Sequence, residues 1–208
     1  MTLAPDIAPA TREDLDWMVA QAICEGWNPG PHDADAFWAC DPGGFLVARS
    51  HGQRVGCISA VRYGNTFGFM GFYIVLPEHR GQGIGLTLWR AAIQRLQGCV
   101  IGLDGVAAQQ DNYARSGFEI AYNNIRFERV NEAAPVSVLH GLLPMEDVAF
   151  EVIADYDRLV FPAPRESFLR AWLTIPEVHF LALPLGRSIA GYGVIRPCQR
   201  GYKIGPLF

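Results

Sequence analysis

The chain has 208 residues, of which 50% are hydrophobic and 18% are charged. This balance supports a well-buried core and excludes a disordered chain. The formal net charge of −4 supplies no basic surface field, so the composition argues against nucleic acid as a partner.

The first part of the chain alternates helical and strand-like patterns. A Thr-x-x-Asp pattern, typical of a capping box, opens a predicted helix over Thr11–Glu25. Its apolar face comprises Leu15, Met18, Val19, Ala22 and Ile23. Asp33–Cys40 predicts a short second helix. Three strands are predicted next, over Gly44–Arg49, Arg54–Tyr63 and Thr66–Leu76. Turns at 51–53 and 64–65 connect them.

The pattern continues to about residue 130. Ile84 to about Gln97 has apolar residues at helical spacing, and Cys99–Leu103 is a short apolar strand. A further helix is predicted over Ala107–Ser116, and Gly117 is the residue type that most readily ends it. Two strands are predicted to close this unit, over Phe118–Tyr122 and Asn124–Arg129. These elements predict a domain over 1–130 and a linker over 131–143.

The remainder, 144–208, repeats the beginning. The strand pattern that starts at Phe45 recurs at Phe180, and Val55–Gly56 recurs as Ala190–Gly191 at the same offset of 135 positions. Two helical patterns, Asp147–Leu159 and 167–174, correspond to the two early helices. The copy ends at Phe208, where its fourth strand would run, which indicates a truncated chain or part of a tandem protein. We expect this partial copy to dock on the first domain and to shape its acceptor side.

Several other classes of protein are disfavoured. The N-terminus lacks the basic start and apolar core of a signal peptide, and the longest apolar stretch, Phe67–Leu76, is too short to span a bilayer. Five scattered cysteines without a C-x-x-C pair are typical of reduced thiols, and the histidines lack metal-ligand spacing. We therefore expect a cytoplasmic protein without a metal or a membrane contact. The sequence leaves an oligomer open.

The glycine-rich sequence RGQGIG at Arg80–Gly85 lies between a predicted strand and a predicted helix. Such a turn offers free backbone N–H groups and the positive end of a helix dipole, which suit a pyrophosphate. No Gly-Lys-Ser/Thr follows, so it is not a P-loop, and the G-x-G-x-G spacing is not that of a dinucleotide fold. A purely structural glycine turn is the remaining alternative.

Two motifs together resemble a known family. Val75–Gly85, with its Val-x-Pro start, is similar to the Arg/Gln-x-x-Gly-x-Gly/Ala motif of the GNAT acetyltransferase superfamily. Tyr113–Phe118 resembles the Tyr-x-x-x-Gly-Phe signature of that superfamily, at the expected separation. The resemblance covers about the first 130 residues. It implies an α/β (α+β) fold, with a mixed, mostly antiparallel central sheet flanked by helices, followed by a partial second copy in a tandem arrangement.

The resemblance also implies an acetyl-CoA-dependent N-acyltransferase and its site. The Arg80 side chain would lie near the pyrophosphate. The pyrophosphate itself would be held by the backbone amides of Gly81, Gln82, Gly83, Ile84, Gly85 and Leu86. The pantetheine arm would pair with the strand residues Phe72, Tyr73, Ile74 and Val75. Tyr113 would protonate the departing CoA thiolate as general acid, because a phenol is a workable donor to a thiolate. Asn112, in a polar stretch, is a further candidate cofactor ligand; that stretch is otherwise the solvated face of its helix.

The general base is less well defined. The family's usual carboxylate on the fourth strand would lie near Met70–Tyr73, where the sequence has no acid. Asp104 lies at the end of the fifth strand, where the resemblance implies that the fourth and fifth strands diverge to admit the substrate. It is the candidate substitute, and capping the helix that follows is its alternative role. Glu25, Asp33 and Asp35 are expected to be solvated surface residues. Aromatic residues of the early helices are candidates for an acceptor pocket or for the core.

The sequence therefore favours transfer of an acetyl group from acetyl-CoA to a primary amine of a small molecule, by direct attack in a ternary complex. No cysteine or serine has a recognisable nucleophile setting, which argues against a covalent intermediate. The alternative is a non-catalytic acyl-CoA-binding sensor or interaction module. The region after Pro144 has no second glycine loop, and we expect it to bind no acetyl-CoA.

Overall fold

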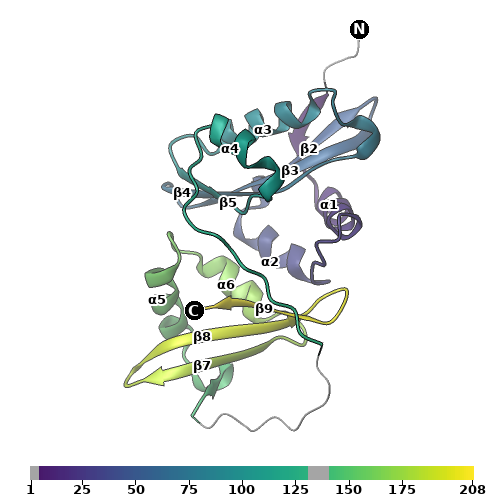
Figure 1. Cartoon of the computed structure of the whole chain (residues 1–208). Coiled ribbons are helices and arrows are strands. Elements are labelled where there is room, and N and C mark those ends of the chain that lie inside the picture. The colour runs from purple at the N-terminus through teal and green to yellow at the C-terminus, as the bar shows by residue number, and fades with distance from the viewer. Residues whose placement is uncertain (1–4, 131–140) are drawn as a thin grey trace.

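The computed structural model describes residues 5–130 and 141–208. These residues form two sheets, each with helices packed on it, stacked one above the other in Figure 1. The domain boundaries given above stay predictions.

The first sheet has five strands in the order β1-β2-β3-β4-β5. The strands are β1 Asp6–Pro9, β2 Phe45–Ser50, β3 Gln53–Tyr63, β4 Phe67–Val75 and β5 Val100–Leu103. Pairing is antiparallel from β1 to β4, and β5 alone joins in parallel, beside β4. The parallel step is possible because a helix crosses over between β4 and β5. This is the mixed, mostly antiparallel sheet that the sequence predicted.

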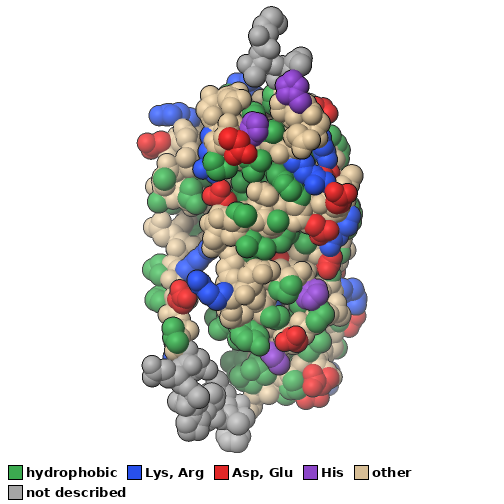
Figure 2. Space-filling view, turned by 90° about the vertical axis from the view of Figure 1, so that its right-hand side faces the viewer, with side chains coloured by type: hydrophobic (Ala, Val, Ile, Leu, Met, Phe, Trp, Pro, Cys, Tyr) green, Lys and Arg blue, Asp and Glu red, His purple; other side chains and the backbone are tan. Residues whose placement is uncertain are grey.

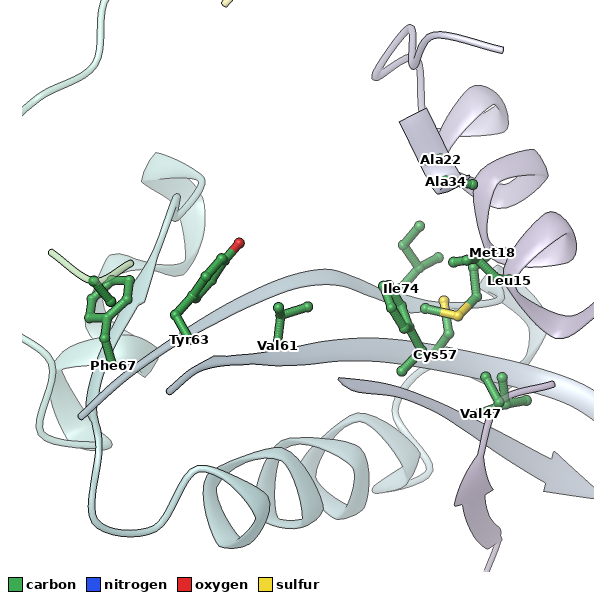
Figure 3. Packing of buried hydrophobic residues seen from close by; sticks show 13 residues of the cluster. Leu15, Met18, Ala22, Ala34, Val47, Cys57, Val61, Tyr63, Phe67 and Ile74 are labelled. Atoms are coloured by element: carbon green, nitrogen blue, oxygen red, sulfur yellow. The ribbon is translucent and has the colours of Figure 1, made fainter. Parts of the chain in front are cut away.

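Helices cover both faces of this sheet (Figure 1). They are α1 Arg12–Cys24, α2 Asp33–Cys40, α3 Ile84–Arg95 and the short α4 Gln110–Arg115, which follows a 3₁₀ turn. Leu15 and Met18 of α1 are fully buried against one face of the sheet (Figure 3). Leu88 and Ala92 of α3 are fully buried against the other. The predicted apolar face of α1 is correct at these positions, but Ile23 is 40% exposed.

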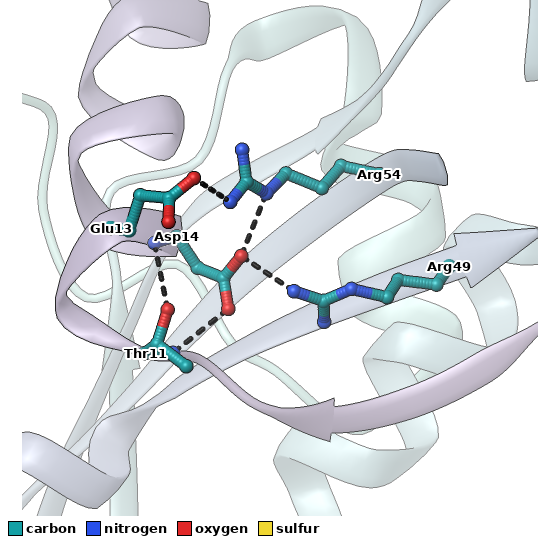
Figure 4. A network of polar contacts seen from close by, with 5 residues as sticks. All are labelled: Thr11, Glu13, Asp14, Arg49 and Arg54. Carbon is teal, nitrogen blue, oxygen red and sulfur yellow. Dashed lines mark hydrogen bonds and ion pairs between the residues drawn. The ribbon is translucent and has the colours of Figure 1, made fainter. Parts of the chain in front are cut away.

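The start of α1 is anchored by a buried carboxylate. Thr11 and Asp14 form the predicted capping box, with reciprocal hydrogen bonds between side chain and backbone. The same Asp14 carboxylate accepts hydrogen bonds from Arg49 at 2.6 Å and Arg54 at 2.7 Å (Figure 4). One side chain therefore caps the start of the helix and ties it to the β2–β3 hairpin.

The second sheet repeats the first hairpins. Its order is β6-β7-β8-β9, all antiparallel, with β6 Leu143–Pro144, β7 His179–Leu185, β8 Ser188–Pro197 and β9 Tyr202–Leu207. Two helices pack on it, α5 Phe150–Val160 and α6 Glu166–Leu173. The strand β9 lies where the repeat predicted the counterpart of the fourth strand.

The two units are in contact through their helices. Phe37 of α2 stacks on Phe168 of α6, with ring centroids 5.6 Å apart, and also contacts Trp172. Phe161, which follows α5, packs edge-on against Tyr63 and Phe67 of the first sheet. The predicted docking of the second unit on the first is therefore present. Figure 2 shows one face of the molecule, on which acidic and basic side chains are interspersed among hydrophobic ones.

The strands predicted over Phe118–Tyr122 and Asn124–Arg129 are wrong, because the structure assigns no strand to either. Their alternating apolar residues are exposed, including Ile120, Ile125 and Phe127, and the segment runs from α4 toward the second unit (Figure 1). Alternation of apolar and polar residues predicts that side chains point to opposite sides, but a strand also needs a neighbouring strand with which its backbone can form hydrogen bonds. Most of the predicted linker, 131–140, lies outside the described residues.

Candidate active site

The loop Arg80–Gly85 connects β4 to α3, as the sequence predicted. Gly81 and Gly83 have left-handed backbone conformations, with φ of 76° and 80°. Gly83 is the N-cap of α3, without a capping side chain, and the first helical hydrogen bond runs from Thr87 N–H to the Gly83 carbonyl at 3.1 Å. The amides before Thr87 therefore have no acceptor within the helix. They combine with the positive end of the helix dipole into a surface suited to an anion.

Gly85 is required for a different reason. Its φ is outside the left-handed region, but a Cβ placed on it would lie 2.6 Å from the hydroxyl oxygen of Tyr73. The first two loop glycines have open space around them and are needed for the turn itself. The third glycine lets the start of α3 approach β4.

The Arg80 side chain is held by protein groups. Its Nε donates to the carbonyl of Val75 at 2.8 Å, and its guanidinium pairs with Glu25, just after α1, at 2.6 Å. Both partners are exposed, so this ion pair contributes little stability. It does fix the loop between the end of β4 and the end of α1. The Gln82 amide likewise donates to the backbone, at the carbonyl of Glu78.

A bulge in β4 interrupts the pairing of this strand with β3. The register between β3 and β4 shifts between Cys57 and Ser59, and Phe72 has a left-handed φ of 47°. The parallel pairing of β4 with β5 ends at Met70, opposite Leu103. The stretch from residue 71 to 75, which contains the candidates Tyr73, Ile74 and Val75, therefore presents a backbone edge that β5 does not cover. The predicted divergence of the fourth and fifth strands lies here.

Tyr113 of α4 is half-buried in an aromatic cluster next to this edge. Its ring stacks on Trp89 of α3 with centroids 5.6 Å apart, and the Tyr73 ring packs on the same indole at 5.6 Å. Gly105 leaves room for the Tyr113 ring, because a Cβ there would lie 2.6 Å from it. Burial raises the pKa of Tyr113, against a smaller opposite effect of a hydrogen bond to the Val106 backbone. The phenol therefore stays protonated at neutral pH, as a proton donor must be.

The other candidates are more exposed. Asp104 accepts a hydrogen bond from the amide of Asn124 at 3.0 Å. The helical segment after it has Val106 as N-cap and no capping side chain, so the alternative capping role of Asp104 is excluded. Asn112 bonds to Gln109 and Arg115 on the exposed face of α4.

Two protein-family models match the chain. The "Acetyltransferase (GNAT) family" matches residues 12–118, just over half of the chain, and an "Acetyltransferase (GNAT) domain" matches residues 153–208. The chain belongs to the GNAT acetyltransferase family. The second match confirms a partial second GNAT copy.

Individual relatives agree with this assignment. The chain is 28% identical over 200 residues to a protein named holothin acyltransferase from Pseudoalteromonas sp. (strain SANK 73390), covering 96% of this chain and 68% of the relative. An uncharacterized protein of Caenorhabditis elegans is 24% identical over 202 residues, covering 88% of this chain and 64% of the relative. This GNAT chain thus spans about two thirds of the length of these curated relatives.

Solved structures show that the fold is shared. A structure titled as a putative acetyltransferase from Pyrococcus horikoshii superposes on the whole chain and on 72% of its own, with a TM-score of 0.81 and 23% identity. The structure of Ard1 from Thermoplasma volcanium covers 58% of this chain and 86% of its own, with a TM-score of 0.50 and 20% identity. The two-unit arrangement therefore corresponds to that of the first structure.

Two site features of this GNAT chain were not predicted. Trp89, on which both tyrosines pack, was assigned only to the apolar stripe of α3; its position one turn after Gly85 was the available signal. Asp33 was expected to be solvated, and this prediction is wrong. Asp33 is 5% exposed and pairs with Arg196 of the second unit, a partner that lies 163 residues away in the sequence. In the described part of the chain, no helix is long and apolar enough to cross a membrane, and no metal-ligand cluster was found.

Proposed function

We propose that this chain transfers an acetyl group from acetyl-CoA to the primary amine of a small molecule. The observation that carries the proposal is the continuous path from the α3 amides, along the uncovered edge of β4, to the bulge at Phe72. Pyrophosphate, pantetheine and thioester follow one another in the same order in CoA. The family assignment supports acyl transfer, and the choice of acetyl and of an amine is ours.

The reaction is a direct attack in a ternary complex. The neutral amine nitrogen attacks the thioester carbonyl carbon, the new C–N bond forms, and the C–S bond breaks. The CoA sulfur takes a proton from Tyr113, while the amine loses one to water or to Asp104. The products are the amide and free CoA, and the tyrosine regains its proton from solvent. Asp104, exposed at the end of β5, is the candidate base that the chain offers there.

The test begins with binding. Calorimetry is expected to give one acetyl-CoA per chain, and Gly83→Val should weaken binding at least about tenfold, because the branched side chain occupies the phosphate position. Gly64→Val is the matched control, since Gly64 has a similar φ of 62° in the β3–β4 turn, with open space around it. Equal affinity in folded wild type and Gly83→Val would sink the assignment. Two acetyl-CoA molecules per chain would contradict the expectation that the second unit binds none.

One observation favours a second function. Residues 70–73 of the sequence contain no acid, so the family's usual base is absent there. A domain that binds acyl-CoA as a sensor would bind it without turnover. Measuring thiol release with a panel of amines separates the two, because the sensor alone predicts binding without any amine-dependent CoA release.

A further inference from the structure

The turn between β8 and β9 in the second unit holds the loop between α1 and α2 in the first. The Asn28 side chain donates to the Arg200 carbonyl at 3.0 Å and accepts from the Arg200 N–H at 2.9 Å. Gln199 N–H donates to the carbonyl of Pro29 at 3.1 Å. Lys203, the only lysine in the sequence, donates from Nζ to the carbonyl of Trp27 at 2.7 Å. Three consecutive loop residues are thus bonded by the other unit.

A buried ion pair between Arg196 and Asp33 also connects the two units at this contact. Arg196 at the end of β8 makes two hydrogen bonds to Asp33 at the start of α2, at 2.8 and 2.9 Å. The guanidinium also lies 4.4 Å from the ring centroid of Trp172. Gly30 is needed because a Cβ would lie 2.8 Å from the carbonyl of Pro197. The two backbones therefore approach closely at a defined point.

The held loop carries an aromatic side chain to the bulge. Trp27 contacts Phe72 edge-on, with ring centroids 6.3 Å apart, and 37% of Trp27 remains exposed. Phe72 is the left-handed residue at which the uncovered edge of β4 begins. The loop itself has left-handed residues at Gly26 and Asn28, so its shape depends on partners outside it.

We infer that the β8–β9 turn of the second unit positions Trp27 as an aromatic wall of the acceptor site, selecting amines with an aromatic body. The inference rests on the proposed acetyl transfer, since it concerns the acceptor of that reaction. In it, Lys203 and Asn28 are positioning residues, and Trp27 is the residue that the acceptor contacts.

The charges around the loop support the same choice. Burial lowers the pKa of Lys203, and the charges of Arg196 and Arg126 act in the same direction, while Cys198 and Asp33 oppose them. The facing carboxylate of Asp33 is used by Arg196, and that of Glu25 by Arg80. A polyamine would meet cations here, whereas a neutral aromatic body would meet the indole.

The experiment compares two amines, phenethylamine and 1,4-diaminobutane, in the full chain at saturating acetyl-CoA. Wild type is expected to have the higher kcat/KM for phenethylamine, and Trp27→Leu should remove most of that preference. Lys203→Met and Asn28→Gly should raise the KM for phenethylamine roughly tenfold, as loss of a charge-assisted or paired hydrogen bond does, with little change in kcat. Lys203→Arg should restore the low KM, because it again donates to the Trp27 carbonyl.

Two controls separate this inference from the proposed function. Arg187→Met changes the β7–β8 turn of the same sheet and should leave the KM unchanged. Acetyl-CoA affinity, measured by calorimetry, should be the same in all variants. A wild type that prefers 1,4-diaminobutane, or that acetylates other amines but neither of these two, would overturn the inference about Trp27, whereas binding of acetyl-CoA without turnover of any amine would overturn the proposed function. Unchanged KM in Lys203→Met and Asn28→Gly would overturn the role of the turn, and loss of acetyl-CoA binding would implicate the proposed function instead.

Discussion

The two units of this chain place helices on a sheet with different polar anchors. In the first unit, Asp14 at the start of α1 is held by arginines of β2 and β3. In the second, Asp157 near the end of α5 accepts two hydrogen bonds from Arg165 and one from Tyr192 of β8. Both carboxylates are buried, yet they lie at opposite ends of their helices. The repeat thus preserves the hydrophobic pattern and the hairpins, while each unit places its ion pair independently.

The units also differ in what surrounds a shared bulge. Register shifts occur between Cys57 and Ser59 in the first sheet and between Gly193 and Ile195 in the second. In the first sheet a non-glycine residue at the bulge, Phe72, takes a left-handed φ, and β4 leads into the glycine loop and α3. Among the described residues, the second bulge has no non-glycine residue with a left-handed φ. The two bulges therefore share a register shift but differ in local backbone conformation.

The largest effect should come from the proposed general acid in the first unit. Tyr113→Phe is expected to lower kcat roughly tenfold to ten-thousandfold, the range for lost proton-transfer assistance, while acetyl-CoA affinity changes little. Steady-state kinetics with the best amine measures the first quantity, and calorimetry the second. Tyr156→Phe in the second unit, which loses only a hydrogen bond to the Ala190 carbonyl, is the control. Equal turnover in both variants would reduce Tyr113 to a packing residue.

The next largest effect concerns the two ion pairs. Arg165→Met should lower the free energy of unfolding by about 3–5 kcal/mol, because it leaves Asp157 buried without a cation. Methionine replaces the apolar stem, but it also removes the guanidinium that lies 3.8 Å from the Phe161 ring centroid, so part of the loss comes from that contact. Arg49→Met should cost less, about 1.5–3 kcal/mol, since Asp14 keeps Arg54 and Thr11. Urea denaturation measures both, and a larger loss in Arg49→Met would contradict this ranking.

Sequence reasoning predicted what local patterns encode and missed what distant partners decide. The capping box at Thr11, the glycine loop and the end of a helix at Gly117 each depend on a few adjacent residues, and all are present. The burial of Asp33 depends on Arg196 in the other unit, which no local pattern indicates. The segment 118–129 has the alternation of two strands but no partner edge. In the candidate site, the divergence of β4 and β5 followed from the resemblance, whereas the aromatic cluster around Trp89 required the packed structure.

The contribution of Asp14, the buried carboxylate at the start of α1, to the free energy of unfolding should depend on pH. Burial alone would raise the pKa of Asp14, but hydrogen bonds from Arg49, Thr11 and Arg54 outweigh it and hold that pKa well below its usual range. The contribution of Asp14 to stability is thus complete above the unfolded pKa of about 3.9 and is lost as the pH falls through the lower folded value. At pH 7, Asp14→Asn should be less stable than wild type by about 1.5–3 kcal/mol.

That difference should shrink as the pH falls below about 4, because the unfolded wild-type chain then binds a proton at Asp14 while the folded protein does not. Urea midpoints from pH 2.5 to 7 for both proteins measure it. Glu166→Gln is the control, because Arg158 lowers the pKa of a more exposed carboxyl there and the expected slope is smaller. A constant gap between Asp14→Asn and wild type over the whole range would mean that packing, and not charge, accounts for the role of Asp14.

The smallest effect tests the helix starts of the two units against each other. The N-cap of α1 is Thr11, whose side chain accepts a hydrogen bond from the Asp14 N–H, while the N-cap of α5 is the exposed Ala149, which has no capping side chain. Ala149→Ser should therefore raise the free energy of unfolding by about 0.5–1 kcal/mol, and Thr11→Ala should lower it by about 0.5–2 kcal/mol. The backbone of Ala149 is already extended, with φ −61° and ψ 138°, so serine needs no rearrangement to accept a hydrogen bond from an amide of the first turn. Thermal unfolding of the two variants and of Ala149→Gly, which lacks a side-chain acceptor, measures the difference. If serine and glycine gave the same midpoint, the start of α5 would be limited by its packing on the second sheet and not by its missing cap.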